Sequence, residues 1–572
     1  MITARRRSIV LLLLIVTFLG AARAQYVLVN QAGYLLDQRK EAYVVGKVDS
    51  FRVITDHGGT IAFSGPVSLT SATDPATGLR TSKADFSALR APGRYRMVSI
   101  PGDTSVPFAV ADNALEGAYR ASLKGYYYQR CGLALLPKYA GVYAHPVCHS
   151  HDAMFHASTG KTGFSASGGG WHDAGDYGKY VVNAGITVGT LLMAYEMFPG
   201  RFSQDDLNIP ESGNGVPDIL DEARYELDWL LEMQDTVDGG EYFKVTTEKF
   251  DGFEMPERDT STRFIYQKSS AATGDFAAVS AQAARIFKGR DPAFARRCLV
   301  AAKTAWKYLE LHPMLVPPMG FQNPPGTWTG GYGDWNDMDE RWWAAVELFE
   351  TTGERTYNDY FLNHYSKSGV FASAMSWPNV QTMAGIEYLV GKQNASDSSA
   401  RADLRSRMVT LCSSLVHRAS EDGLNVTLRT QDYVWGSNGI VLNNAVVLIV
   451  GNELTNDRSF VATALEQLNY ILGCNCKSIS FLTGVGAHAA MHIHHRPSAA
   501  DGIDAPVPGL VAGGPNSWRA DSVLQKEFPS GTPPARCYVD DDRSYASNEI
   551  CINWNAPIVF VTGYFSSAMD RR

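Results

Sequence analysis

The sequence predicts two domains of different structural class, a β-sandwich of about 90 residues followed by a larger helical domain. The chain has 572 residues, which is more than a single hydrophobic core ordinarily supports. Short segments of alternating hydrophobicity, separated by turn residues, fill residues 26–110. After Asp112 the apolar residues recur with a helical period instead. We therefore expect a sandwich over residues 25–112 and a second domain over residues 113–572.

The first residues carry the features of a secretory signal peptide. Arg5, Arg6 and Arg7 precede an apolar run over residues 9–19, and Ala22-Arg23-Ala24 supplies a small-x-small cleavage site. We expect residues 1–24 to be removed and the mature chain to begin near Gln25. No later run approaches the ~20 apolar residues of a membrane span. The prediction is a secreted protein, extracellular or periplasmic, with no membrane contact after the signal is removed.

Charge and composition narrow the possible partners. Removal of the four arginines in residues 1–24 would take the formal charge from −8 to −12, which argues against a nucleic-acid partner. A neutral polymer or a small neutral substrate is compatible with this balance. Aromatic residues make up 11% of the chain, and many lie beside Gly, Asp and Asn in its later half, which suits stacking on sugars. Core packing is the alternative explanation for any single ring.

The two predicted domains differ in local pattern. The sandwich is predicted from YVLVNQAGY, EAYVVGK, SFRVITDHGG, TIAFSG, RAPGRYRMVSI and VPFAVAD. In residues 217–234, Ile219, Ala223, Leu227 and Leu230 share one helical face, with Pro217 at the start and glycines beyond the end. Further helices are predicted around 183–198, 276–288, 294–311, 340–352, 400–419 and 459–472. Long loops between them are where a functional site would be built.

Two acidic clusters far apart in the chain carry the strongest chemical signal. GGWHDAGDYGKY contains Asp173 and Asp176, and YVDDDRSYASNEICINWNAP contains Glu549. Two carboxylates three residues apart would make a strong acceptor for a water proton, and a partly desolvated Glu549 would stay protonated as a general acid. An acid and a base on opposite sides of a bond is the glycosidase arrangement. The alternative is that the aspartates cap the following helix and Glu549 is an ordinary surface acid.

Three segments together resemble a known family. GGWHDAGDYGKYVVNAG, SFLTGVGAHAAMHIHHRPS and YVDDDRSYASNEICINWNAP follow one another after the sandwich. In this order they look like the three conserved blocks of glycoside hydrolase family 9. The chain is most similar to the bacterial endoglucanases of that family that carry an immunoglobulin-like domain before the catalytic one. The resemblance covers nearly the whole mature chain.

The resemblance implies both a fold and a reaction. The expected architecture is an immunoglobulin-like β-sandwich followed by an all-α (α/α)6 barrel, and the expected activity is an inverting endo-β-1,4-glucanase (cellulase) acting on cellulose or related β-glucans. Carried over by position, Asp176 is the general base, Asp173 helps to hold the nucleophilic water and Glu549 is the general acid. The matching positions for substrate binding are His494 and Arg496, which would hydrogen-bond the sugar, and Trp435 and Trp554, which would stack on it.

Four residues offer the ligand set of a structural zinc site. Cys131, Cys148, His149 and His172 supply two thiolates and two imidazoles. From the residues alone, a disulfide between Cys131 and Cys148 is equally compatible with an exported protein. The resemblance favours zinc, because sandwich-bearing members of the family hold the metal with this pattern. Since His172 adjoins Asp173, zinc would brace the catalytic loop and take no part in the chemistry.

A calcium site is also expected, in the stretch NIPESGNGVPDILDE. Its oxygen-bearing side chains are Glu211, Asn214, Asp218 and Asp221, and its glycines allow a tight turn at the start of a helix. Related enzymes bind calcium in such loops. Acidic residues are also favourable at a helix N-terminus through the helix dipole alone. No organic cofactor is expected.

Three functional alternatives follow from the sequence. The first is the endoglucanase, expected to be a monomer that acts on a β-glucan polysaccharide or oligosaccharide. The second is an exo-acting β-glucosidase or exo-β-glucosaminidase of the same family, which would differ in the loops that close one end of the cleft. The third is a non-catalytic polysaccharide-binding protein, which the presence of Asp173, Asp176 and Glu549 opposes.

Overall fold

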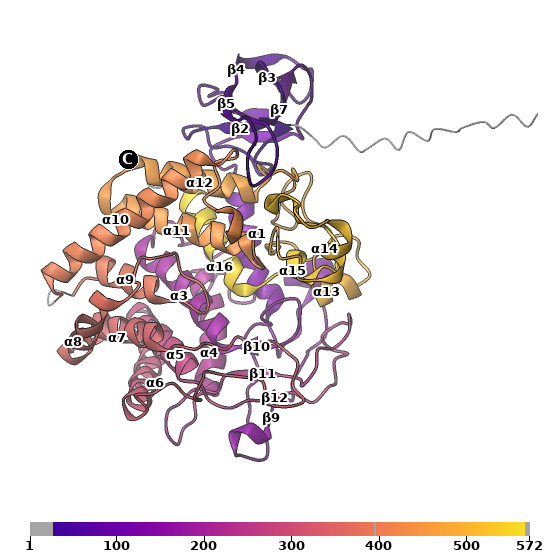
Figure 1. The fold of residues 1–572 in the computed structure, drawn as a ribbon. Coiled ribbons are helices and arrows are strands. Elements are labelled where there is room, and N and C mark those ends of the chain that lie inside the picture. The colour runs from indigo at the N-terminus through magenta and orange to yellow at the C-terminus, as the bar shows by residue number, and fades with distance from the viewer. Residues whose placement is uncertain (1–26, 394–395, 567–572) are drawn as a thin grey trace, which may run out of the picture.

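A computed structural model describes residues 27–393 and 396–566 of the chain. Figure 1 shows a small β-domain, in indigo, at one end of a much larger helical domain. The predicted signal peptide and its cleavage site lie outside the described residues. No helix within the described ranges is long and apolar enough to cross a membrane.

The N-terminal domain is a sandwich of two four-stranded sheets. One sheet has the order β1-β2-β6-β5 and the other β4-β3-β7-β8, and every neighbouring pair is antiparallel. Inward-facing residues of both sheets, such as Val44 on β2 and Phe51 on β3, are buried in one core. The Tyr34 ring packs edge-on against Phe86 and Phe108, with centroids 4.9 and 5.3 Å away. The strands are β1 (Val27–Leu28), β2 (Glu41–Val45), β3 (Ser50–Thr55), β4 (Ile61–Pro66), β5 (Ser68–Ser71), β6 (Thr81–Asp85), β7 (Gly93–Ile100) and β8 (Phe108–Val110).

The second domain is built from helices arranged in an inner and an outer layer. Its helices of ten residues or more are α1 (Glu116–Gln129), α3 (Val181–Met197), α4 (Asp218–Met233), α5 (Ser270–Phe287), α6 (Pro292–Leu311), α7 (Met338–Thr352), α8 (Arg355–His364), α9 (Gln381–Val390), α10 (Ser398–Glu421), α11 (Ser437–Thr455), α12 (Arg458–Ile471) and α16 (Ile552–Ser566). Helices α3, α5, α7, α9, α11 and α16 are buried along nearly their whole length. The six others are amphipathic or exposed on one side, as α4 is, with the predicted face of Ile219, Ala223, Leu227 and Leu230 buried.

Contacts link the buried helices in the order α9, α7, α5, α3, α16 and α11, and the outer helix α10 contacts both α9 and α11. Helix α3 contacts α5 and α16, α5 contacts α7, α7 contacts α9, and α11 contacts α16. Six buried helices surrounded by six outer ones form an (α/α)6 barrel. The predicted fold class, an immunoglobulin-like sandwich followed by this barrel, is confirmed.

The sandwich packs against the barrel at α12. The Tyr43 hydroxyl donates to Glu466 Oε2 at 2.9 Å, and the Asn30 amide donates to Asn469 Oδ1 at 2.9 Å. The backbone N–H of Gln31 donates to the carbonyl of Leu472 at 2.8 Å. These contacts join the two domains through buried polar groups.

Long loops at one end of the barrel carry a further small sheet, separate from the two sheets of the sandwich. It has the order β10-β11-β12-β9, from β9 (Met154–Phe155), β10 (Lys179–Tyr180), β11 (Lys244–Thr246) and β12 (Phe264–Ile265). Figure 1 shows this sheet beside the helical ring, on the side away from the sandwich. Strand β10 leads directly into α3, so the sheet fixes the loop before that helix.

Candidate active site

Backbone contacts bring the three predicted segments together. Ala174, between the two predicted catalytic aspartates, forms an antiparallel bridge with Cys551, and His494 forms a parallel bridge with Glu549. The backbone N–H of Arg496 donates to the carbonyl of Gly175 at 3.0 Å. Segments more than 300 residues apart in the chain are therefore hydrogen-bonded neighbours.

Gly175 makes this close approach possible. A Cβ atom at this position would lie 2.2 Å from the carbonyl oxygen of His494. Any other residue would push the loop away from the segment that carries His494 and Arg496. The glycine in the DAGD motif is thus required by packing between two segments of the site.

The assembled segments surround a cavity of about 690 Å³. Its volume lies within the range usual for small-molecule sites. Six of the predicted site residues line it, namely Asp176, Glu549, His494, Arg496, Trp435 and Trp554. The seventh, Asp173, is completely buried and is hydrogen-bonded to the lining residue Tyr332.

Asp173 is held by two donor groups. Asn183 Nδ2 lies 2.9 and 3.0 Å from its two carboxylate oxygens, and the Tyr332 hydroxyl donates to Oδ2 at 3.0 Å. Burial raises the pKa of Asp173 to about 8, and the charge of Asp176 adds to this shift. The donors oppose the shift without overcoming it. Asp173 is therefore fixed in position by its donors.

Asp176 reaches the cavity surface, where 8% of its surface is exposed. The backbone N–H of Gly178 donates to its Oδ2 at 2.9 Å, and the Tyr180 hydroxyl lies 3.4 Å from the same oxygen. Both contacts use one oxygen. The arrangement leaves Oδ1 as the oxygen able to accept a proton from a bound molecule.

Glu549 lines the cavity at the end of the short helix α15 (Tyr545–Asn548). Burial raises its pKa well above the usual carboxyl range, and the negative charges of Asp176 and Asp173 add to this shift. The predicted environment of a general acid, desolvated and beside other acids, is what this carboxyl has.

His494 and Arg496 are oriented by backbone carbonyls. His494 Nδ1 lies 2.5 Å from the carbonyl oxygen of Asp542, and since a carbonyl only accepts, Nδ1 carries the hydrogen and Nε2 is an acceptor. Arg496 donates to the carbonyls of Gly175 and Asp251 through three of its N–H groups. The remaining N–H groups of Arg496 and Nε2 of His494 are available to sugar hydroxyls.

The two predicted stacking residues differ in how they are held. Trp435 is 42% exposed, and its ring lies 5.3 Å from that of Tyr545. Trp554 stands in a slot made by Gly436, Gly439 and Gly513, at each of which a Cβ would lie within 3.1 Å of the indole ring. Trp554 is thus a rigid wall of the cavity, whereas Trp435 is a more exposed surface at its rim.

Several cavity residues were not predicted as site residues. Tyr332 lies in a long glycine-rich loop between α6 and α7, and its motif carries no signal that links it to Asp173. Tyr180 and Asn183 lie within the segment that carries the aspartates, so proximity in sequence could have identified them. The further aromatic residues of the lining that were not predicted are Phe250, Trp328, Trp377 and Tyr545.

The four predicted zinc ligands meet at one point. Cys131, Cys148, His149 and His172 each offer a ligand atom, and all four atoms lie within 4.8 Å of one another. Both cysteines are free thiols, so the disulfide alternative does not occur here. The other ring nitrogen of His149 lies 3.2 Å from Asp259, the type of carboxylate partner that orients a metal-bound histidine. Donor type and spacing fit a structural zinc ion.

The predicted zinc ligands connect directly to the loop that carries Asp173 and Asp176. Residues 129–131 pair with residues 170–172, through Cys131 N–H to the Gly170 carbonyl at 2.8 Å and His172 N–H to the Gln129 carbonyl at 2.7 Å. Trp171 on the opposite face of this pair receives support from α4, since its backbone N–H donates to Glu226 at 2.5 Å. Cys131 and His172 therefore point toward the metal position while Asp173 follows immediately.

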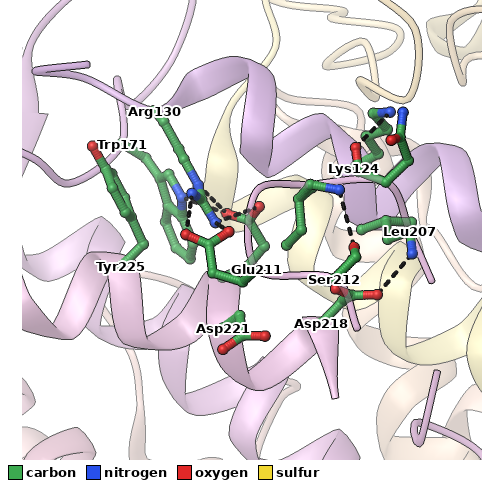
Figure 2. Close-up of polar contacts among 12 residues, drawn as sticks. Lys124, Arg130, Trp171, Leu207, Glu211, Ser212, Asp218, Asp221 and Tyr225 are labelled. Carbon is green, nitrogen blue, oxygen red and sulfur yellow. Dashed lines mark hydrogen bonds and ion pairs between the residues drawn. The ribbon is translucent and has the colours of Figure 1, made fainter. Parts of the chain in front are cut away.

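The predicted calcium loop is only partly arranged as expected. Asp218 and Asp221 lie in a cluster with Asp205, with one oxygen of each within 4.8 Å of the others. Glu211 lies outside this cluster because both its oxygens are bound by Arg130, at 3.0 and 3.1 Å. Figure 2 shows Glu211 turned toward Arg130 and away from Asp218. Asp205 thus takes the place predicted for Glu211.

Asn214 also differs from its predicted arrangement. Its amide nitrogen lies 3.2 Å from Asp221 Oδ2, and its carbonyl oxygen accepts the backbone N–H of Val216. It therefore presents a donor, not an oxygen ligand, to the cluster. Burial raises the pKa of Asp221 to about 7, and neighbouring acids add to this shift. A bound cation would offset this unfavourable charge, so the three aspartates fit a divalent ion.

Comparison with known proteins identifies the family. The family model described as "Glycosyl hydrolase family 9" matches residues 116–562, and the model described as "Cellulase N-terminal ig-like domain" matches residues 22–105. The chain is 36% identical over 540 residues to endoglucanase D of Acetivibrio thermocellus, covering 94% of this chain and 82% of that protein. It is 35% identical over 548 residues to a xyloglucan-specific endo-β-1,4-glucanase of Bacteroides ovatus, covering 93% and 92%.

A solved structure gives the same result. The structure described as a Zn-binding triple mutant of the family 9 endoglucanase J30 superposes with a TM-score of 0.86 at 33% identity, covering 93% of this chain and 99% of that one. Sequence and fold agree over nearly the whole length. The chain therefore belongs to glycosyl hydrolase family 9, a family of inverting glycoside hydrolases, and carries the cellulase-type immunoglobulin-like domain before its catalytic barrel.

Proposed function

We propose that the protein hydrolyses β-1,4-glucosidic bonds with inversion, with Asp176 as general base and Glu549 as general acid. The observation that carries this proposal is that both carboxyls line one cavity although they lie on different segments. In the proposed reaction, water attacks the anomeric carbon as the bond to the leaving oxygen breaks. Asp176 takes a proton from the water, and Glu549 gives its proton to the leaving oxygen.

The surroundings of the two carboxyls support these roles. Glu549 must hold a proton before the bond breaks, and burial raises its pKa in that direction. Asp176 has one oxygen engaged by Gly178 and the other free to accept. Asp173 would orient the attacking water or Asp176, because Asn183 and Tyr332 fix its position.

A β-glucan is the substrate that this lining favours. Trp435 and Trp554 offer aromatic faces for sugar rings, and His494 and Arg496 offer an acceptor and donors for hydroxyls. Tryptophan faces with a few convergent polar groups are typical of such sites. Attack within chains is supported by the names of the relatives, both of which are endoglucanases.

Early-time analysis of cellohexaose digestion tests the activity. Proton NMR would record the anomer first formed, and chromatography would record the product lengths. We expect a mixture of internal products that appear first as α-anomers. Glucose alone beside a shrinking ladder would indicate the exo-acting alternative, and products appearing first as β-anomers would contradict inversion.

We propose structural roles for two metals. Zinc held by Cys131, Cys148, His149 and His172 would lock the pairing of residues 129–131 with 170–172 and so brace Asp173. Calcium held by Asp205, Asp218 and Asp221 would stabilise the loop before α4. Calorimetric titration with calcium tests the second site. Asp205→Asn should lose binding and Glu211→Gln should keep it, and the reverse result would restore Glu211 as a ligand.

Export is proposed from the N-terminal sequence alone. Arg5 to Arg7, the apolar run and the Ala22-Arg23-Ala24 site support it. N-terminal sequencing of the protein recovered outside the cytoplasm should begin near Gln25. A chain that retains residues 1–24 and stays in the cytoplasm would contradict the proposal.

A further inference from the structure

Lys244 is a buried lysine whose ammonium group is completely satisfied by hydrogen bonds. It lies on β11 with no exposed surface. Its Nζ donates to Asn323 Oδ1 at 2.7 Å, to Thr329 Oγ1 at 3.0 Å and to the carbonyl of Gly330 at 2.7 Å. An ammonium has three N–H donors, so each donor has one acceptor. All three acceptors belong to the single loop 323–330.

Aromatic rings enclose the same ammonium. Nζ lies 4.8 Å from the ring centroid of Tyr266, 5.4 Å from that of Phe321 and 5.5 Å from that of Tyr180. Burial lowers the pKa of Lys244 to about 7. The negative charge of Asp176 opposes that shift, and the ring faces also favour the charged form. The lysine is thus buried at a cost in desolvation.

The loop that Lys244 binds is one wall of the cavity. The five consecutive residues 328–332 all line it. The backbone N–H of Gly330 donates to the Tyr180 hydroxyl at 3.0 Å, and that hydroxyl lies 3.4 Å from Asp176 Oδ2. Two residues further on, the Tyr332 hydroxyl donates to Asp173. The anchored loop therefore reaches both aspartates.

We propose that Lys244 is a positioning residue for hydrolysis, which fixes the loop 323–332 so that Tyr332 and Tyr180 hold Asp173 and Asp176 in their working positions. This inference rests on the proposed roles of the two aspartates. Lys244 itself touches no cavity surface, so its effect passes through Gly330 and Thr329. Loss of the anchor would displace the aspartates without removing either carboxyl.

The primary test is Lys244→Met, which keeps the length of the side chain and removes its donors. On cellohexaose we expect kcat to fall about 10- to 100-fold, because small displacements of catalytic groups cost up to about that factor. KM should change less than about threefold, since His494, Arg496 and the tryptophans are untouched. A kcat within twofold of wild type would overturn the inference.

Lys161→Met is the matched control. Lys161 also lies over aromatic rings, at 5.5 Å from Phe155 and 5.4 Å from Tyr242, and pairs with Asp235 at 2.9 Å. Within the described part of the chain, the residues that its side chain contacts, Phe155, Tyr242 and Asp235, do not line the cavity. Substitution of Lys161 should leave kcat and KM unchanged. If Lys161→Met lowered kcat as much as Lys244→Met, the effect of both lysines would be one of general stability, which would contradict the positioning role.

A double-mutant cycle with Tyr332→Phe separates positioning from general destabilisation. If Lys244 acts through the loop, Lys244→Met should reduce kcat clearly less in the Tyr332→Phe background than in the wild type. Strict additivity would overturn the inference. Should Lys244→Met fail to fold, Thr329→Val removes one of the three acceptors of Lys244, together with the contacts of that hydroxyl with Thr246 and Thr247. This variant must itself lower kcat at an unchanged melting temperature or the inference fails.

Asp176→Asn completes the set as a reference for the reaction. An inactive Asp176→Asn protein beside a fully active Lys244→Met protein would refute the positioning role and leave the proposed function intact. Full activity in Asp176→Asn would instead refute the proposed function.

Discussion

The two sides of the cavity hold their carboxyls in different ways. Asp173 and Asp176 receive hydrogen bonds from Asn183, Tyr332 and the backbone of Gly178. No side chain within residues 27–393 and 396–566 donates to the Glu549 carboxyl, whose pKa is raised mainly by burial. Donors fix an acceptor in place, and desolvation keeps a proton on an acid. The difference in donors matches the opposite tasks proposed for the two sides, although burial raises the pKa of Asp173 as well.

The largest expected effect is that of Glu549→Gln. The amide cannot deliver a proton, so kcat on cellohexaose should fall by about 10²–10⁴-fold, while substrate affinity and melting temperature stay at wild-type values. Steady-state kinetics and a thermal melt measure these quantities. Glu254→Gln, on a loop near the cavity, is the control and should behave as wild type. Wild-type turnover in Glu549→Gln would place the acid elsewhere.

The donors on the aspartate side give the next largest effect. Tyr332→Phe removes a hydrogen bond to Asp173, and bonds to charged groups are worth about 1.5–3 kcal/mol, so kcat should fall about 10- to 100-fold. Tyr242→Phe removes a similar bond, from a buried tyrosine to Asp235 at 3.0 Å, and should leave kcat unchanged. Equal losses in both variants would show that Tyr332 has no special relation to the reaction.

We expect zinc to support only the side of the cavity that carries Asp173 and Asp176. Cys131→Ala removes one of four ligands, and we expect the zinc content to fall, the melting temperature to drop and kcat to decrease about tenfold, since support for metal sites is worth about 10- to 100-fold. Cys298→Ala, at another buried free thiol, should keep its zinc and its kcat. Elemental analysis and kinetics measure the two outcomes. A zinc-free protein with full activity would contradict the proposal that zinc holds Asp173 in position.

The pH profile gives the smallest and most specific effect. Because Glu549 must be protonated and its pKa is raised, activity should persist above the usual carboxyl range. It should then decline about tenfold per pH unit on the alkaline side, as Glu549 loses its proton. The residual activity of Glu549→Gln should lack this alkaline decline. An unchanged alkaline limb in that variant would assign it to another group.

Sequence patterns predicted the outer helices better than the inner ones. The helix predicted over residues 217–234 is α4, Asp218–Met233, because its apolar residues lie on one face. Helices α11 and α16 were not predicted, since both are buried on all sides and have no polar face to reveal a period. In α16, Pro557 also signals a break that does not occur. Burial from every direction weakens the pattern on which helix prediction depends, although the equally buried α3 and α5 were predicted.

Residues of the site were predictable where a motif carried them. Asp176, Glu549, His494 and Arg496 lie in the three recognised segments and meet in one cavity. Tyr332 lies outside these segments and could not be predicted. Its hydrogen bond to Asp173 joins residues 159 apart in the chain, and its loop has no distinctive sequence pattern. Glu211 was expected to bind calcium, but its carboxylate pairs with Arg130, which lies 81 residues away in the chain. The sequence alone does not reveal this pairing.

The most direct test of the proposed acid and base compares two substrates with different leaving groups. A 2,4-dinitrophenyl β-cellobioside needs no protonation of its leaving oxygen, whereas cellohexaose does. Glu549→Gln should keep kcat within about tenfold of wild type on the aryl substrate and lose about 10²–10⁴-fold on cellohexaose, while Asp176→Asn should lose activity on both. Equal losses on both substrates for Glu549→Gln, or full aryl activity in Asp176→Asn, would contradict the assignment of acid and base.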